Sequence, residues 1–102
     1  MSLRHVIVAS AFVVVCALCS PASAQNEGFQ PNTDRPGNDF GNFTIGDAES
    51  CREACQINQR CRAWAFVKAG IQGPSARCFL KNRAPAVRAN RCCTSGVVRR
   101  ID

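Results

Sequence analysis

The pattern of hydrophobic and polar positions predicts four short strands. Apolar residues alternate with small or polar ones from Phe40 to Ile45, which is typical of a strand with one buried face. The run from Ala63 to Val67 is apolar throughout and predicts a central strand that is covered on both sides. A further strand is predicted from Arg77 to Lys81, and a closing strand from Val97 to Ile101.

One short helix is predicted between the first two of these strands. It begins after Asp47, a residue type that commonly caps a helix N-terminus, and it ends near Asn58. Acidic residues in its early part favour the positive end of the helix dipole. Cys51 and Cys55 lie four positions apart, so both sulfurs are expected on the helix face that packs against the sheet.

The remaining segments contain residues that break regular structure. Asn, Pro, Gly and Asp are frequent from Gln25 to Gly41, which predicts a flexible lead-in over residues 25–38 and a folded domain over residues 39–102. The segment from Gly70 to Ser75 predicts a turn or mobile loop, and the segment from Asn82 to Asn90 predicts an irregular connection.

The first 24 residues are typical of a cleavable export signal. Arg4 and His5 form a short basic start, an apolar stretch runs from Val6 to Cys19, and small residues at Ala22 and Ala24 form a cleavage pattern. The apolar stretch is shorter than the roughly 20 residues that span a bilayer, so we expect no membrane span after cleavage. The mature chain is therefore predicted to be secreted or periplasmic.

The cysteines that follow the signal favour a disulfide framework. The chain has 8 cysteines, of which Cys16 and Cys19 lie in the signal. A domain this small is difficult to stabilise by its core alone, and disulfides form in exported proteins. A zinc site of four thiolates is the alternative for the first four mature cysteines, but an oxidising compartment favours sulfur-sulfur bonds. The six mature cysteines are Cys51, Cys55, Cys61, Cys78, Cys92 and Cys93.

Several motifs in this order resemble the PAN/apple domain family, in particular its short bacterial form. They are the segment from Asp34 to Phe40, the C-x3-C-x5-C spacing that begins at Cys51, the sequence Cys78-Phe79-Leu80-Lys81, and the sequence Ser95-Gly96-Val97. The resemblance implies an α+β fold, in which one helix packs across a small antiparallel sheet and disulfides join helix to strand. It also implies a binding module for protein or carbohydrate.

The resemblance further implies that Cys51 pairs with Cys78 and Cys55 with Cys61. The fuller apple form has another bridge that joins the two ends of the domain, but no mature cysteine precedes Cys51 here. Cys92 and Cys93 therefore lack that partner. A bridge between these neighbours is favoured, although it would be strained and easily reduced, and free or intermolecular thiols are the alternatives.

Catalysis is not expected. The single histidine, His5, lies in the signal, so the mature chain has no Ser-His or Cys-His pair. The mature carboxylates are better explained as loop residues, a helix cap and helix-end charges. No cofactor or metal is expected either.

The formal net charge of +6 is concentrated in the second half of the chain. Basic residues commonly keep a small secreted domain soluble, and the alternative is that they form a binding face for an anionic partner. We expect an extracellular or periplasmic protein or an anionic carbohydrate, and we do not expect nucleic acid because the chain is exported. A cationic antimicrobial protein is one alternative, and a protease inhibitor that presents the loop Gly70–Arg77 is another. The candidate ligand-binding residues are Lys81, Arg83 and Arg88 as the densest cluster, together with Arg62, Arg77 and Arg91.

Overall fold

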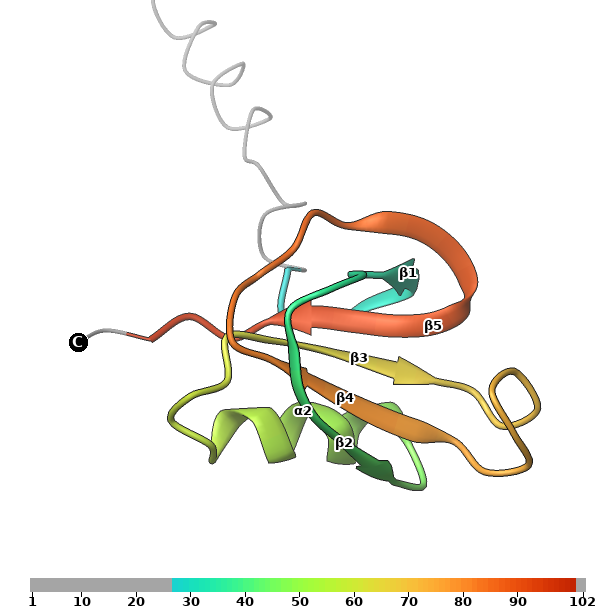
Figure 1. Cartoon of the computed structure of the whole chain (residues 1–102). Coiled ribbons are helices and arrows are strands. Elements are labelled where there is room, and N and C mark those ends of the chain that lie inside the picture. The colour runs from blue at the N-terminus through green and yellow to red at the C-terminus, as the bar shows by residue number, and fades with distance from the viewer. Residues whose placement is uncertain (1–26, 101–102) are drawn as a thin grey trace, which may run out of the picture.

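The computed structural model describes residues 27–100, in which a helix lies across one face of an antiparallel sheet (Figure 1). The sheet has five strands in the order β1-β5-β3-β4-β2, and every pair of neighbours is antiparallel. This arrangement confirms the predicted α+β class. The elements are β1 (Gln30–Asp34), β2 (Asp39–Thr44), α2 (Ala48–Gln56), β3 (Ala63–Val67), β4 (Arg77–Lys81) and β5 (Arg88–Val97).

The two faces of the sheet are distinguished by the alternation of side chains along β3 and β4. Trp64 and Leu80 face α2 and form the core with its two cysteines, and they are 0% and 5% exposed. Phe66 packs against this core while remaining partly exposed. Because side chains alternate along a strand, Ala65 and Phe79 lie on the opposite face, which α2 does not cover. That face is called the open face below, although Ala65 and Val67 on it are only 1% and 5% exposed.

The start of α2 confirms the predicted cap. Asp47 accepts a hydrogen bond from the backbone N–H of Ser50 at 2.8 Å, and this bond lowers the pKa of the Asp47 carboxyl. Because the charged form of Asp47 is favoured in the folded state, its contribution to stability is present above the ordinary aspartate pKa and is lost as the pH falls through the lowered value.

The end of α2 is held by an arginine from the C-terminal segment, which sequence analysis did not predict. The guanidinium of Arg100 donates hydrogen bonds to the carbonyl oxygens of Cys55 at 2.6 Å, Gln56 at 2.9 Å and Asn58 at 2.7 Å. The last carbonyls of a helix have no partner within it, and they form the negative end of its dipole. Arg100 therefore joins the C-terminal segment to α2.

Two sequence predictions about strands are wrong. Part of the expected flexible lead-in forms β1, which pairs with β5, so the folded domain begins before Asp39. The closing strand is β5, which spans Arg88–Val97 and so ends where the predicted strand Val97–Ile101 was expected to begin. Both β1 and β5 are rich in polar residues. Their backbones are ordered by hydrogen bonds to neighbouring strands, and a pattern of hydrophobic residues does not reveal such pairing.

A buried arginine connects β1 to the segment that leads into β5. Arg35 is 7% exposed and donates hydrogen bonds to the carbonyl of Pro85 at 2.9 Å and to the side-chain oxygen of Gln30 at 2.7 Å. Burial lowers the pKa of its guanidinium, although arginine stays charged in proteins. Much of the irregular segment predicted from Asn82 to Asn90 is observed, and it ends when β5 begins.

The signal predicted over residues 1–24 lies outside the described residues. Within residues 27–100, no helix combines the length and apolar character needed to cross a membrane.

We predict that Gly96→Ala destabilises the fold. A methyl group at this buried position would lie 2.2 Å from the carbonyl oxygen of Gly28 and 3.0 Å from the ring of Trp64. Because the nearest atoms belong to backbone, the segment before β1 must move, and overpacking of this kind costs about 1–3 kcal/mol. Urea unfolding measures the loss of stability.

Gly41→Ala in β2 is the matched control, since no atom lies within 4 Å of the added methyl group. An equal loss of stability in both variants would contradict a steric origin at Gly96.

Candidate functional site

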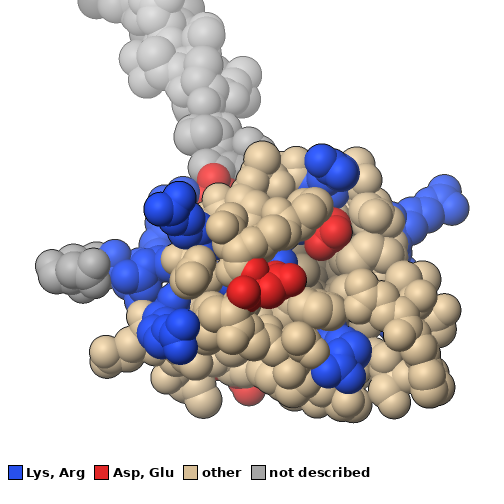
Figure 2. Space-filling model, in the orientation of Figure 1, with Lys and Arg blue, Asp and Glu red and all other residues tan. Residues whose placement is uncertain are grey.

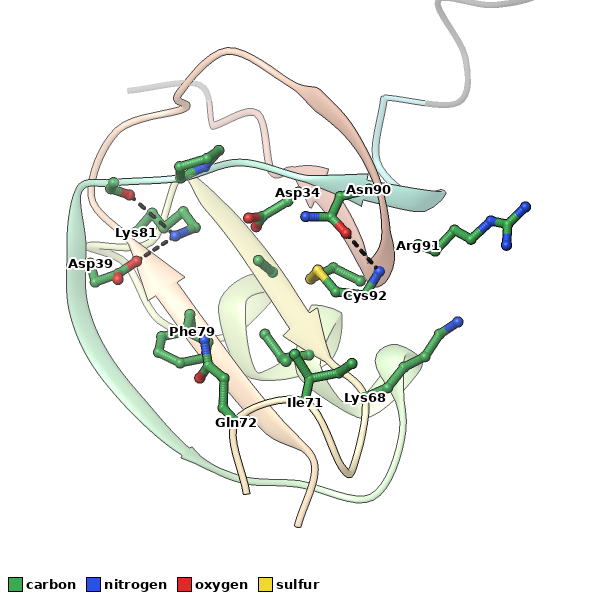
Figure 3. A pocket seen from close by; sticks show the side chains of 15 residues that line it. Asp34, Asp39, Lys68, Ile71, Gln72, Phe79, Lys81, Asn90, Arg91 and Cys92 are labelled. Atoms are coloured by element: carbon green, nitrogen blue, oxygen red, sulfur yellow. Dashed lines mark hydrogen bonds and ion pairs between the residues drawn. A yellow bond between two sulfur atoms is a disulfide. The ribbon is translucent and has the colours of Figure 1, made fainter. Parts of the chain in front are cut away.

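A cavity of about 750 Å³ opens on the open face of the sheet (Figure 3). Its apolar lining comes from Ala65 and Val67 of β3 and from Phe79 of β4, and its polar lining includes Asp34 at the end of β1. Lys68 and Arg91 also line it, and Figure 3 shows that both side chains project away from the other labelled residues. A cavity of this size with an apolar floor and a few polar groups is typical of a ligand site.

Lys81 lies at one end of this cavity and is buried, which corrects its expected place in an exposed basic cluster. Only 2% of the residue is exposed, and its ammonium forms an ion pair with Asp39 and donates a hydrogen bond to the carbonyl of Gly37 at 3.2 Å (Figure 3). This carbonyl belongs to Gly37, whose backbone φ is 101°. Residues that carry a side chain rarely adopt this angle, so the turn favours glycine. Burial and pairing make Lys81 a structural cation of the sheet.

The two bridges that the resemblance implied are present on the helix side of the sheet. Cys51 and Cys78 have Cα atoms 5.4 Å apart, and Cys55 and Cys61 have Cα atoms 5.2 Å apart, both within the usual range for a disulfide. All four residues are 0% exposed. These bridges join α2 to β4 and to the segment that follows the helix.

Cys92 and Cys93 form a third bridge, between neighbouring residues, which is the alternative that sequence analysis favoured. It lies in the wall of the cavity, where the pairing of β5 with β1 is interrupted. Pro31 pairs with Thr94 and Thr33 pairs with Ala89, so β5 has extra residues between these pairs, and Figure 1 shows the strand bending sharply. Such a bulge interrupts the regular alternation of side chains, which otherwise places neighbours on opposite faces.

A second candidate surface is a groove of about 410 Å³ that four arginines line. Arg62 follows the Cys55–Cys61 bridge, Arg83 follows β4, and Arg99 and Arg100 follow β5. Figure 2 shows basic side chains gathered on this side of the molecule, beside the C-terminal end of the described chain. We call this groove, with the four arginines that line it, the arginine groove.

The arginine groove includes only part of the predicted basic set. Arg62 and Arg83 are in it, whereas Arg91 lies beside the cavity. Arg88 is exposed at the start of β5, and Arg77 donates hydrogen bonds to the side chains of Thr44 and Asn42 on β2. The structure therefore does not bring Lys81, Arg83 and Arg88 together as one exposed cluster.

Comparison with known families agrees with this architecture. The model of the PAN domain family matches residues 33–81. The match runs from within β1 to the end of β4, so it includes α2 and both buried bridges. No curated protein is similar enough to the chain to count as a match.

The PAN match supports a binding module of the PAN type in general, since PAN domains are generally non-catalytic. A disulfide-rich PAN domain is also typical of extracellular or secreted proteins. The match ends before β5, so it does not include the bridge between Cys92 and Cys93, and of the four groove arginines it includes only Arg62.

Sequence analysis missed several charged residues that the structure places in these sites, among them Lys68 in the cavity and Arg100 in the groove. Asp34 and Asp39 were interpreted as loop residues, although one lines the cavity beside the third bridge and the other neutralises Lys81. Arg99 was not among the candidate ligand residues, yet it lines the groove. A signal for Lys81 was present in the sequence: it alternates with Leu80 and therefore shares the face of Phe79.

Proposed function

We propose that this chain is an exported binding module of the PAN type that recognises an anionic carbohydrate through the arginine groove. The observation that supports this proposal most is the convergence of four arginines from three separate parts of the chain on one groove. Arginine binds carboxylate and sulfate groups with planar, charge-assisted hydrogen bonds.

The four arginines of the groove differ in their exposure and in their bonding partners within the chain. Arg100 holds the end of α2, and Arg62 donates a hydrogen bond to the carbonyl of Gln59 at 3.0 Å. Arg83 is exposed, and Arg99 is exposed and paired with Glu27. An exposed ion pair contributes little to stability, so an anionic ligand can replace Glu27 at Arg99 without a large cost. Arg83 and Arg99 are therefore the two side chains that we expect to contact the ligand first.

Binding to a sulfated polysaccharide of the heparin type tests this proposal. At low salt we expect the double variant Arg83→Ser/Arg99→Ser to bind about tenfold or more weakly, because each charge-assisted hydrogen bond contributes about 1.5–3 kcal/mol before screening. Binding of the parent chain should also weaken as salt is added, since exposed charges are screened over about 8 Å at physiological ionic strength.

The double variant Arg88→Ser/Arg91→Ser is the matched control, because it removes the same charge from exposed positions outside the groove. Equal losses in both variants would show that only net charge matters. If neither variant loses affinity, the groove is not the recognition surface, and the loop Gly70–Arg77 becomes the next candidate. Selective binding to acidic proteins would overturn the carbohydrate assignment and retain the groove.

The two other functional classes are tested by separate assays. A cationic antimicrobial protein should kill cells, and a protease inhibitor should slow peptide hydrolysis through its exposed loop. A positive result in either assay, with no binding to polysaccharide, would replace the proposed function.

A further inference from the structure

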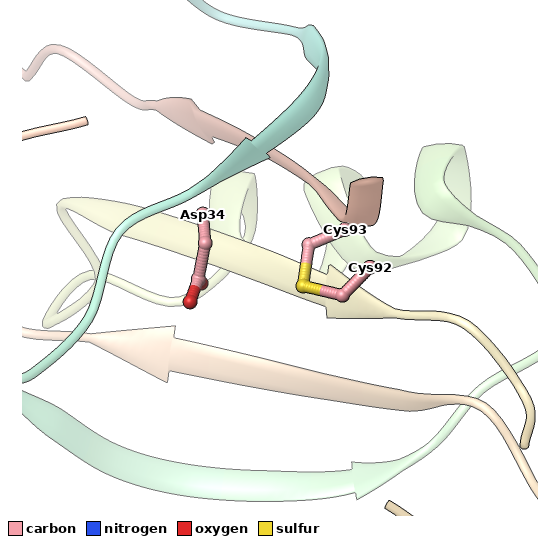
Figure 4. A group of neighbouring side chains, drawn as sticks. All are labelled: Asp34, Cys92 and Cys93. Atoms are coloured by element: carbon pink, nitrogen blue, oxygen red, sulfur yellow. A yellow bond between two sulfur atoms is a disulfide. The ribbon is translucent and has the colours of Figure 1, made fainter. Parts of the chain in front are cut away.

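One cluster of metal-binding residue types stands out within residues 27–100. A carboxylate oxygen of Asp34 and the sulfurs of Cys92 and Cys93 all lie within 4.8 Å of one another (Figure 4). The cluster depends on the bulge in β5, because regular alternation would place neighbouring cysteines on opposite faces of the strand. Asp34 reaches it from the end of β1, and its Oδ1 accepts a hydrogen bond from the N–H of Arg35 at 2.8 Å.

The bridge in this cluster differs from the other two in its access to solvent. Cys92 is partly exposed and lines the cavity, although its partner Cys93 is only 1% exposed, whereas Cys51, Cys55, Cys61 and Cys78 are 0% exposed. Thiol-disulfide exchange requires a thiolate to reach a sulfur of the bridge. A small thiol can therefore reach Cys92 while the two bridges of the core stay protected.

We propose that reduction of this bridge by a low-molecular-weight thiol opens a binding site for a thiophilic divalent cation of the zinc class. One thiolate of the reductant attacks Sγ of Cys92, the sulfur-sulfur bond breaks, and its electron pair leaves on Sγ of Cys93. A second thiolate attacks the sulfur that the reductant has added, which releases the oxidised reductant as a disulfide and leaves Cys92 as a thiolate. Two electrons thus pass from two thiols to the bridge.

The reduced cluster has donors that suit such a cation. Zinc takes thiolate ligands at about 2.3 Å and carboxylate oxygens at about 2.0–2.2 Å in a tetrahedral arrangement. Two thiolates on one tetrahedral ion lie about 3.8 Å apart, as follows from that bond length, and the ligand atoms of Asp34, Cys92 and Cys93 already lie within 4.8 Å of one another. The two sulfurs therefore need only a local separation after the bridge opens, and the carboxylate of Asp34 supplies the third ligand.

The charges around the cluster also suit a cation that binds together with thiolates. Two thiolates and one carboxylate exceed the charge of a divalent ion. Lys68 and Arg91 line the same cavity, but their side chains project away from Asp34 and Cys92 (Figure 3), so solvent screens most of this excess. In the oxidised chain the sulfurs are bonded to each other and are not thiolates, so the site is closed to the cation.

The test begins with selective reduction of the full chain by glutathione without denaturant. Alkylation and mass spectrometry should find two new thiols, at Cys92 and Cys93. Cadmium is the spectroscopic probe, and the reduced chain should bind one cadmium ion with a sulfur-to-metal charge-transfer absorption that excess zinc removes. The oxidised chain and the variant Cys92→Ser/Cys93→Ser should not show this absorption.

Asp34→Asn tests the third ligand, because the amide oxygen can still accept the hydrogen bond from Arg35 while the charge is lost. We expect cadmium affinity to fall about tenfold or more, since even a change in an outer group that supports a ligand commonly costs about 10–100-fold, and Asp34 is assigned as a direct ligand. Glu49→Gln, on the exposed side of α2, is the matched control and should not change the affinity.

Three results would overturn the proposal. The first is new thiols at the buried pairs before Cys92 and Cys93. The second is equal cadmium binding by the oxidised and reduced chains, and the third is one cadmium ion per two chains. Unchanged affinity in Asp34→Asn would remove Asp34 from the site and overturn the three-ligand assignment.

Discussion

Replacing Trp64 by alanine should lower the free energy of unfolding by about 3–5 kcal/mol, which is the usual cost of deleting a large buried aromatic side chain. Trp64 is 0% exposed, its ring centroid lies 5.6 Å from that of Phe29, and it packs in the core with Cys51 and Leu80. Small domains have a total stability of about 5–15 kcal/mol, so this loss threatens the folded state. Urea unfolding at neutral pH measures it.

Ile57→Ala is the control for this variant, since Ile57 is 85% exposed just after α2. Its effect should stay within about 0.5 kcal/mol, as is usual for surface positions. A melting temperature that is unchanged in Trp64→Ala would contradict the burial of the indole and would place Trp64 among the candidate ligand contacts.

Removal of the bridge between Cys51 and Cys78 by the double variant Cys51→Ala/Cys78→Ala should cost about 3.6 kcal/mol. These cysteines are separated by 27 positions, and a disulfide that closes a longer loop restricts the unfolded chain more. The bridge also fastens α2 to β4, the strand that lies between β3 and β2. Loss of stability and of cooperativity can both be followed by urea unfolding.

The corresponding variant Cys55→Ala/Cys61→Ala is the comparison, because it removes the same number of buried sulfurs from a pair that is separated by only 6 positions. The loop-closure argument predicts a smaller cost of about 2.4 kcal/mol. If the short loop proves the more costly to open, packing around the sulfurs outweighs loop closure in this domain.

The elements that sequence analysis located correctly are those whose signals are local. The cap at Asp47 and the spacing of Cys51 and Cys55 specify α2 within a few residues of its observed bounds. The unbroken apolar run of β3 specifies a strand that is buried on both faces. In both α2 and β3, the residues that favour the element locally are also the ones that it buries. The hydrophobic periodicity and the intrinsic propensity therefore predict the same secondary structure.

The position of Lys81 was indicated by the alternation of side chains along its strand, but its charge led to the prediction that it is exposed. The alternation along β4 places it beside Phe79 on one face, opposite Leu80. Its charge, however, suggested solvent exposure, since lysine is rarely buried without a partner. The partner is Asp39, 42 positions earlier in the chain, and only the pairing of β2 with β4 brings the two together.

The sequence by itself determined the helix, the two central strands and the basic character of the second half, because each depends on residues that are close together along the chain. The tertiary structure alone decided that β1 joins the sheet and that four distant arginines share one groove. It also placed Asp34 beside Cys92 and Cys93. The physical reason is that these polar segments carry little periodic signal of their own, and strand pairing across the sheet, with the bulge it produces in β5, determines where their side chains lie.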